Sequence, residues 1–208
     1  MTDKLYDPVV LITGAGKGVG RRLAEALAGR GAIVAANDIS PVNVEQVVNK
    51  INAQGGKSKA YIEDIAKKVA VQALVKNVED DFGRIDVLIN HAAVAPQVPL
   101  LEMDEWDWRR TLDVNLTGAF LLIQSVGRVM QAQGAGLIVN LLPLLNPVPL
   151  RPSPFGSGAG AYFASMAGLT ELTRQAEREL NPHGIRVRLV ENLSPENAVN
   201  AVLRLMEE

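Results

Sequence analysis

A glycine-rich stretch near the N-terminus carries the clearest chemical signal in this sequence. Residues 13–20 read TGAGKGVG and stand between an apolar, β-branched run and a helical pattern. Glycines there permit a tight turn, let the backbone approach a phosphate and let the helix lie close to the strand. Free N–H groups and the dipole at the helix start then attract phosphate, so the stretch predicts a dinucleotide pyrophosphate site rather than a merely tight turn. The residues expected to form this site are Gly14, Lys17, Gly18, Val19 and Gly20.

Asp38 adds a second part of the same predicted site. It closes another apolar run, 18 positions after Gly20. A carboxylate at the end of a second strand can accept hydrogen bonds from both hydroxyls of an adenosine ribose, and it repels a 2′-phosphate. Asp38 therefore favours NAD over NADP as the cofactor.

Composition bounds the class of protein. The chain has 208 residues, of which 48% are apolar, and a formal charge of −2. We therefore predict one domain over residues 1–208 and no nucleic-acid partner. Apolar runs fall far short of the ~20 residues of a membrane span, and the first residues lack a signal-peptide pattern, so we expect a cytoplasmic protein with no membrane partner. Because cysteine is absent and the two histidines, His91 and His183, lie far apart, no metal site is predicted.

Apolar runs alternate with helical patterns along the chain. Strands are expected at residues 9–12, 32–36, 58–61, 87–90, 137–141 and 185–190, and helices at 41–53, 67–82, 104–132, 161–180 and, capped by Ser194, 195–208. Continuous rather than alternating hydrophobicity predicts a parallel sheet that is covered on both faces. The fold class is therefore α/β, a single doubly wound Rossmann-type domain of about six parallel strands with helices on both faces. Residues 143–160, rich in proline and glycine, are expected to form a loop.

Taken in order, these residues and four further motifs resemble the short-chain dehydrogenase/reductase family. The further motifs are Asp64-Ile65, Asn90-His91-Ala92-Ala93, Asn115 within DVNLTG, and Tyr162. The resemblance implies an oxidoreductase that transfers hydride between a nicotinamide cofactor and a carbonyl or alcohol. It implies that Asp64 and Ile65 hold adenine, although Asp64 could instead cap the helix that follows.

Two features of the resemblance bear on the cofactor. Lys17 stands where family members that use NADP often carry a basic residue, but a carboxylate facing the ribose should outweigh a flexible, solvated lysine, so NAD remains favoured. Asn90 is expected to line the cofactor site, at the first position of the family's Asn-Asn-Ala-Gly tetrad. The second and fourth positions depart from that tetrad. We interpret His91 as a packed structural histidine and His183 as part of a surface turn.

The family's catalytic pattern is incomplete in this chain. Tyr162 stands at the position of the general acid–base and Asn115 at that of the proton path. Met166 replaces the family's lysine, and residues 141–143 offer no hydroxyl where the family has serine. An unassisted tyrosine has a pKa near 10, so about one in a thousand is ionised at pH 7, and a thioether cannot lower that pKa. Alcohol oxidation, which needs tyrosinate, should therefore suffer more than carbonyl reduction.

Two further departures concern the surroundings of the site. Arg151, Ser153 and Ser157 lie in a loop about six residues longer than the family's usual spacing, and one of them could replace a missing group, although such a loop is a poor platform for precise placement. After residue 190 this sequence shows neither the family's Pro-Gly turn nor most of its substrate lid, so we expect an open site.

Three hypotheses follow, and the sequence ranks them. The first is an NAD-dependent oxidoreductase of weakened activity, and the second is an inactive NAD(H)-binding regulatory or scaffold subunit. The third, a structural subunit without cofactor, ranks last because it makes the glycines and Asp38 accidental. By resemblance we also expect a homodimer or homotetramer, formed through helices 104–132 and 161–180. The apolar residues that could serve either core or interface are Leu116, Phe120, Ile123, Phe163, Leu169 and Leu172.

Overall fold

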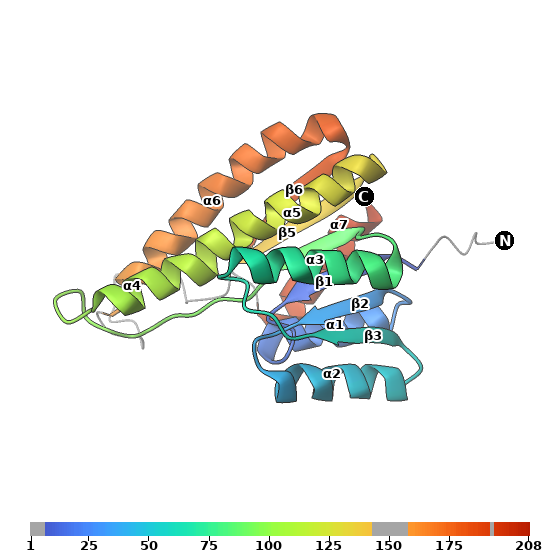
Figure 1. Cartoon of the computed structure of the whole chain (residues 1–208), viewed down its shortest axis with the longest axis horizontal. Coiled ribbons are helices and arrows are strands. Elements are labelled where there is room, and N and C mark those ends of the chain that lie inside the picture. Colours follow the sequence, from blue (N-terminus) through green and yellow to red (C-terminus); the bar gives the residue numbers. More distant parts are fainter. Residues whose placement is uncertain (1–6, 143–157, 192–193) are drawn as a thin grey trace.

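A parallel sheet of six strands forms the centre of the protein. The computed structural model describes residues 7–142, 158–191 and 194–208, and its strands lie in the order β3-β2-β1-β4-β5-β6 (Figure 1). The strands are β1 (Val9–Thr13), β2 (Ile33–Asn37), β3 (Lys57–Tyr61), β4 (Val87–Asn90), β5 (Gly136–Leu142) and β6 (Ile185–Glu191). The order reverses direction between β1 and β4, which is the doubly wound topology that the sequence predicts.

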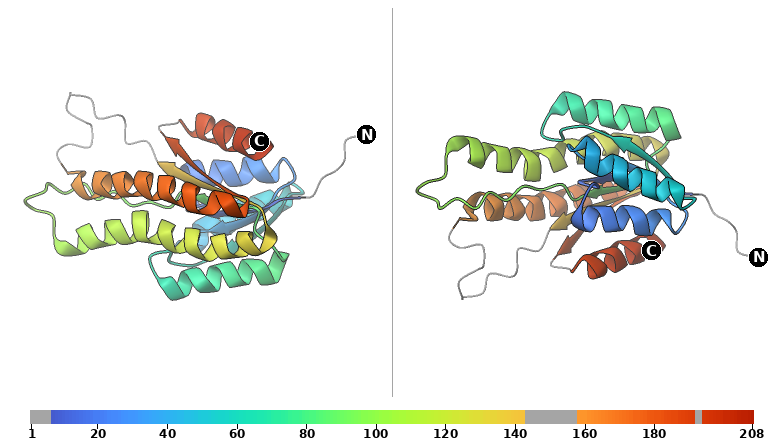
Figure 2. Two further views of the ribbon diagram at one scale, coloured as in Figure 1. Left: turned by 90° about the horizontal axis from the view of Figure 1, so that it is seen from above. Right: turned by 90° about the horizontal axis from the view of Figure 1, so that it is seen from below.

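Helices cover both faces of the sheet (Figure 2). On one face lie α1 (Gly18–Ala28), α2 (Pro41–Ala53) and α7 (Pro195–Glu207), and on the other lie α3 (Lys68–Phe82), α4 (Glu105–Leu112), α5 (Gly118–Gln133) and α6 (Gly160–Leu180). Alternate strand residues enter the two cores: Ile12 packs with the first set of helices and Leu11 with the second. For the described residues, the prediction of one α/β domain with a parallel sheet covered by helices on both faces is confirmed.

Hydrophobic patterning differs between central and edge strands. Every residue of β1 and β4 is buried, whereas the edge strand β3 alternates between exposed and half-buried positions and ends at the buried Tyr61. The expectation of continuous hydrophobicity in all strands is therefore wrong for β3, because one side of an edge strand remains open to water.

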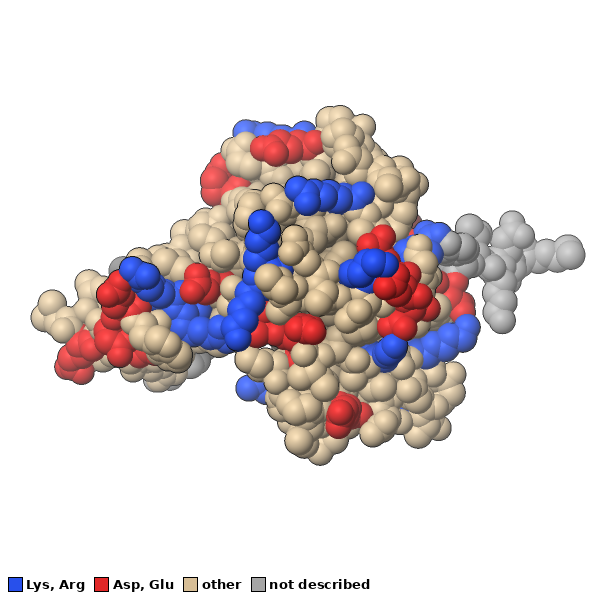
Figure 3. Space-filling view, in the orientation of Figure 1, with Lys and Arg blue, Asp and Glu red and all other residues tan. Residues whose placement is uncertain are grey.

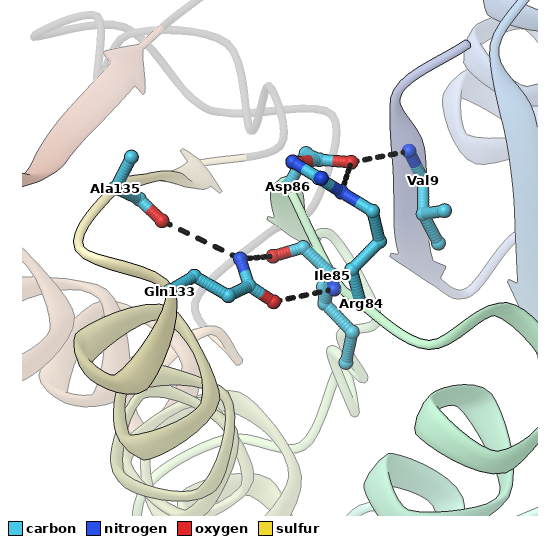
Figure 4. Close-up of polar contacts among 6 residues, drawn as sticks. All are labelled: Val9, Arg84, Ile85, Asp86, Gln133 and Ala135. Carbon is cyan, nitrogen blue, oxygen red and sulfur yellow. Dashed lines mark hydrogen bonds and ion pairs between the residues drawn. The ribbon is translucent and has the colours of Figure 1, made fainter. Parts of the chain in front are cut away.

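The start of the sheet is fixed by a polar network (Figure 4). Asp86 Oδ2 accepts a hydrogen bond from the Val9 N–H at 2.8 Å and also pairs with Arg84. The Gln133 amide bonds both the N–H and the C=O of Ile85 at 3.0 Å. These contacts lie at the amino ends of the strands, and they leave the carboxyl ends available for a ligand.

The predicted helix at residues 104–132 is one continuous helical rod with a change of winding. Between α4 and α5, residues Asp113–Thr117 form a π-helical segment, which shifts the register of the side chains that follow. This rod and α6 lie side by side and project beyond the carboxyl ends of the strands (Figure 1). These helices, which carry Asn115 and Tyr162, therefore form one wall beside the carboxyl ends of the strands.

The C-terminal helix agrees with its prediction. Ser194 Oγ accepts a hydrogen bond from the Asn197 N–H, and Ala198, Val202 and Leu203 are buried against the α1 side of the core. Residues 143–157, which include Arg151, Ser153 and Ser157, lie outside the described ranges, so their predicted loop and rescue roles stay predictions.

Two surface properties can be stated for the described residues. None of their helices combines the length and apolar character that crossing a bilayer requires. On the face shown in Figure 3, acidic and basic side chains lie interspersed over the surface rather than in one large patch of a single sign.

Candidate nucleotide-binding and active site

A cavity of about 530 Å³ lies at the carboxyl ends of β1, β2 and β4. This is the edge at which doubly wound sheets bind ligands, next to the point where the strand order reverses. Eight of the predicted site residues line it: Gly14, Lys17, Gly18, Val19, Asp38, Asp64, Ile65 and Tyr162. The other three predicted residues, Gly20, Asn90 and Asn115, are not among the residues that line this cavity.

The glycine turn has the close approaches that its sequence predicts. Gly14 has φ +67°, and a Cβ there would come within 2.9 Å of the Ala92 Cα. A Cβ on Gly20 would come within 2.2 Å of the Gly14 carbonyl oxygen, so only glycine lets α1 pack this closely on β1. Helix α1 begins at Gly18, and in the described part of the chain the side chain of its N-cap residue, Lys17, does not bond the first turn. The first-turn N–H groups are therefore open to an anionic ligand.

Backbone hydrogen bonds hold the Asp38 carboxylate in place. Its Oδ2 accepts from the Gly16 N–H at 2.9 Å, and its Oδ1 accepts from the Ser40 N–H at 3.0 Å. A Cβ on Gly16 would come within 2.8 Å of Oδ2, so glycine is required for this contact as well. Each carboxylate oxygen can accept more than one hydrogen bond, which leaves capacity for ribose hydroxyls on the cavity side.

Asp64 forms the far side of the cavity together with Arg110. Its Oδ1 accepts from the Ala66 N–H at 3.1 Å, and its carboxylate pairs with Arg110 Nη1 at 3.2 Å. Among the described contacts the side chain caps a turn rather than α3, whose N-cap residue is Lys67. Ile65 is buried and packs beside Gly118, where a Cβ would come within 3.1 Å of its side chain.

Asn115 joins the β4–α4 loop to α6. Its Oδ1 accepts from the Val94 N–H at 2.8 Å, and its Nδ2 donates to the Val94 carbonyl at 2.9 Å and to Ser165 Oγ at 3.0 Å. Ser165 Oγ in turn donates to the Tyr162 carbonyl at 2.7 Å. The amide therefore positions the backbone around the tyrosine, and the π-helical segment places it to do so.

Tyr162 and Met166 lie one turn apart on α6, and both are buried. The tyrosine is 3% exposed and the methionine 8% exposed. Burial raises the pKa of the Tyr162 hydroxyl to about 12. The ring still lines the main cavity, and it meets the Phe163 ring edge-on at 5.8 Å. A neutral phenol can donate a proton, but it is a poor source of tyrosinate.

Asn90 belongs to a buried polar chain rather than to the main cavity. Its Nδ2 donates to Asn140 Oδ1 at 2.8 Å, and Asn140 Nδ2 donates to Thr173 Oγ1 at 2.8 Å. Asn90 Oδ1 has no hydrogen-bond partner among the described residues, and Asn90 and Met166 both line a second cavity of about 10 Å³. Its predicted contact with a cofactor stays a prediction.

Several cavity residues were not predicted from the sequence. They are Asn37, Ile39, Ser40, Asn43, Glu63, Arg110, Val114 and the run from His91 to Ala95. Most of them directly follow a strand that also carries a predicted site residue, and this position could have indicated a place at the cavity. Arg110 comes from α4, and no sequence signal indicates that it lines the cavity. His91 packs against Gly20 as a structural histidine would, but it also lines the cavity.

Comparison with known proteins shows the family of this chain. The family model for short chain dehydrogenases matches residues 8–193. The chain belongs to the short-chain dehydrogenase family. It is 35% identical over 187 residues to D-threitol dehydrogenase of Mycolicibacterium smegmatis, covering 90% of this chain and 70% of that protein. A 3-oxoacyl-(acyl-carrier-protein) reductase of Staphylococcus epidermidis is 38% identical over 181 residues, covering 86% of this chain and 72% of the relative.

Solved structures of other short-chain dehydrogenases share the fold. A metagenomic short-chain oxidoreductase in complex with NADP superposes with a TM-score of 0.88 at 30% identity, covering 98% of this chain and 92% of that one. An NAD⁺-bound xylitol dehydrogenase superposes with a TM-score of 0.81 at 31% identity, covering 90% and 70%. The short-chain dehydrogenase fold binds a nicotinamide cofactor, and these two neighbours hold different forms of it.

Proposed function

We propose that this short-chain dehydrogenase is an NAD(H)-dependent oxidoreductase with weakened chemistry that acts on a small carbonyl or alcohol substrate. One observation carries the proposal: a single cavity joins the glycine turn, Asp38 and the Tyr162 ring. A dinucleotide needs such a continuous path, with donors for its phosphates, a carboxylate at the adenosine end and a proton donor at the reacting end. The glycine turn fits this group: Gly14 and Gly18 line the cavity, and the close approaches at Gly14 and Gly20 admit no side chain larger than hydrogen.

Each part of the cavity has a chemical role in this proposal. The first-turn N–H groups of α1 bind the pyrophosphate, and Asp38 accepts hydrogen bonds from the adenosine ribose. Asp64 and Ile65 bind the adenine edge. The nicotinamide, when bound, supplies the hydride for reduction or takes it up in oxidation. In carbonyl reduction Tyr162 would donate its hydroxyl proton to the carbonyl oxygen, and Asn115 would position the helix that carries Tyr162.

The environment of Tyr162 supports carbonyl reduction over alcohol oxidation. With a pKa of about 12, about one tyrosine in 100,000 is ionised at pH 7, so oxidation lacks its base. Reduction uses the neutral phenol, which is the dominant form. Met166 offers no charge to shift this balance, and it lies where the family's lysine would.

The choice of NAD over NADP rests on Asp38. Its carboxylate is oriented by two backbone N–H groups and would meet the 2′-phosphate of NADP with like charge. Lys17 is exposed at the cavity edge and can turn into solvent. We therefore expect NADH to bind more tightly than NADPH.

A second function is favoured by a specific observation. Met166, which departs from the family pattern, and the burial of Tyr162 both affect chemistry, while the adenosine half of the cavity keeps its predicted residues. An NAD(H)-binding regulatory or scaffold subunit would keep the adenosine half of the site intact while its catalytic half is altered. Steady-state oxidation of NADH with a panel of aldehydes and ketones separates the two functions. Turnover that Tyr162→Phe abolishes supports the enzyme, and NADH binding without turnover supports the regulatory subunit.

We also propose that the protein forms a homodimer or homotetramer through α5 and α6. Phe120 and Phe163 are 43% and 42% exposed on these helices, whereas Ile123 and Leu169 are buried in the monomer. Exposed aromatic rings on two adjacent helices suit burial against a second copy. Light scattering that gives the mass of one 22.3 kDa chain would contradict this assembly.

A further inference from the structure

His91 lies at the junction of β4 and the first turn of α1. Its backbone N–H donates to Thr13 Oγ1 at 3.1 Å, which fixes the residue against the end of β1. Side chains alternate along a strand, so Asn90 points to the α6 side and His91 to the α1 side. There the ring packs on Gly20: a Cβ on that glycine would come within 2.8 Å of the His91 Cδ2.

The two ring nitrogens of His91 have different surroundings. Nδ1 is buried and has no hydrogen-bond partner among the described residues, whereas Nε2 is not among the buried atoms and the residue lines the main cavity. Burial lowers the pKa of the imidazole to about 4, although the Asp38 carboxylate opposes this shift, so the ring is neutral at pH 7. A neutral ring carries one proton, and an orphaned buried N–H is rarely tolerated. The proton therefore belongs on Nε2, at the cavity.

We propose that His91 is a hydrogen-bond donor to the bound dinucleotide, with its Nε2–H directed at a pyrophosphate oxygen beside the N-terminus of α1. This inference rests on the nucleotide site proposed above and adds a residue to it. The ring shares the cavity with Gly14, Gly18 and Val19, whose turn receives the phosphates. A neutral donor suits this place, because the positive end of the helix dipole disfavours a cation there.

Calorimetric titration with NADH tests the proposal in four proteins: wild type, His91→Phe, His91→Gln and His183→Gln. Loss of a hydrogen bond to a charged group should weaken NADH binding by about tenfold or more in His91→Phe. His91→Gln places an amide donor near the Nε2 position and should stay within about threefold of wild type. His183→Gln is the matched control, since that ring lies outside the cavity against Gln131. Adenosine, which has no phosphate, should bind His91→Phe and wild type equally.

A second readout concerns the proton itself. Nitrogen-15 NMR of the two histidines should show His91 as the Nε2–H tautomer near pH 7, with a resonance that moves when NADH is added. A proton on Nδ1, or NADH affinity in His91→Phe equal to wild type, overturns the proposal. Equal weakening of NADH and adenosine binding overturns it too, because damaged packing would then be the cause. If wild type fails to bind NADH, the proposed function fails as well, so the two failures are distinguishable. Should His91→Phe not fold, the glutamine variant and the tautomer decide.

Discussion

Replacing Met166 by lysine should lower the pKa of Tyr162 by about two units. The two residues lie four apart on α6, which puts their side chains on the same face about 6 Å apart. At an effective dielectric constant of about 20, a charge at that distance stabilises a tyrosinate by roughly 3 kcal/mol, or about two pKa units. The pKa of Tyr162 should therefore fall from about 12 to about 10. Asn90 lines the same small cavity as Met166, and its Oδ1, which has no partner among the described residues, is an available acceptor for the new ammonium group.

A pH titration of carbon-13-labelled tyrosine by NMR measures this change directly. The chain has three tyrosines, and Tyr162→Phe identifies the resonance. Met166→Gln, which is polar but uncharged, is the matched control and should leave the pKa near its wild-type value. If the enzyme hypothesis holds, alcohol oxidation at pH 7 should rise by about 100-fold with the tyrosinate population. A folded Met166→Lys protein whose Tyr162 pKa equals that of the glutamine control would refute this reasoning.

Three further substitutions test the architecture around the site by urea unfolding and NADH titration. Gly20→Ala puts a Cβ 2.2 Å from the Gly14 carbonyl, and we expect a stability loss of roughly 1–3 kcal/mol with weaker NADH binding; unchanged stability would contradict the close approach. Asn115→Ala removes three hydrogen bonds and should destabilise the fold by roughly 2–4 kcal/mol, whereas a loss below 0.5 kcal/mol, about the error of such a measurement, would show that they contribute little. Asp86→Ala should lower the free energy of unfolding by roughly 1–3 kcal/mol and leave NADH affinity unchanged, because Asp86 lies at the amino ends of the strands, away from the cavity. A large change in NADH affinity would contradict that separation.

Sequence patterns predict most of this fold because burial on both faces leaves a direct signature. The apolar runs of β1 and β4 mark central strands, and Ser194 marks the start of α7. The π-helical segment Asp113–Thr117 leaves no such mark, since its sequence does not differ in type from the α-helices on either side. The edge strand β3 is recognised only from its position after α2, because water contacts one side of it.

The candidate site divides in the same way. Glycines and Asp38 are predictable because the chemistry of close approach and ribose binding dictates residue type at fixed spacing. Arg110 reaches the cavity only through the packing of α4 beside the β3–α3 connection, which no local pattern encodes. The clamp that Asn115 forms on Val94 likewise joins residues 21 apart. The elevated pKa of Tyr162 follows from burial, and this tertiary property leaves less tyrosinate at neutral pH than the sequence alone suggests.

Calorimetric titration of the purified protein, with NADH and separately with NADPH, is the most direct test of whether the proposed site binds NAD(H). We predict saturable NADH binding with a dissociation constant in the micromolar range, weaker NADPH binding, and loss of NADH binding in Asp38→Ala. Absence of saturable heat with both nucleotides, in a protein that unfolds cooperatively, would contradict it. The glycine turn would then serve the packing of α1 on β1 alone.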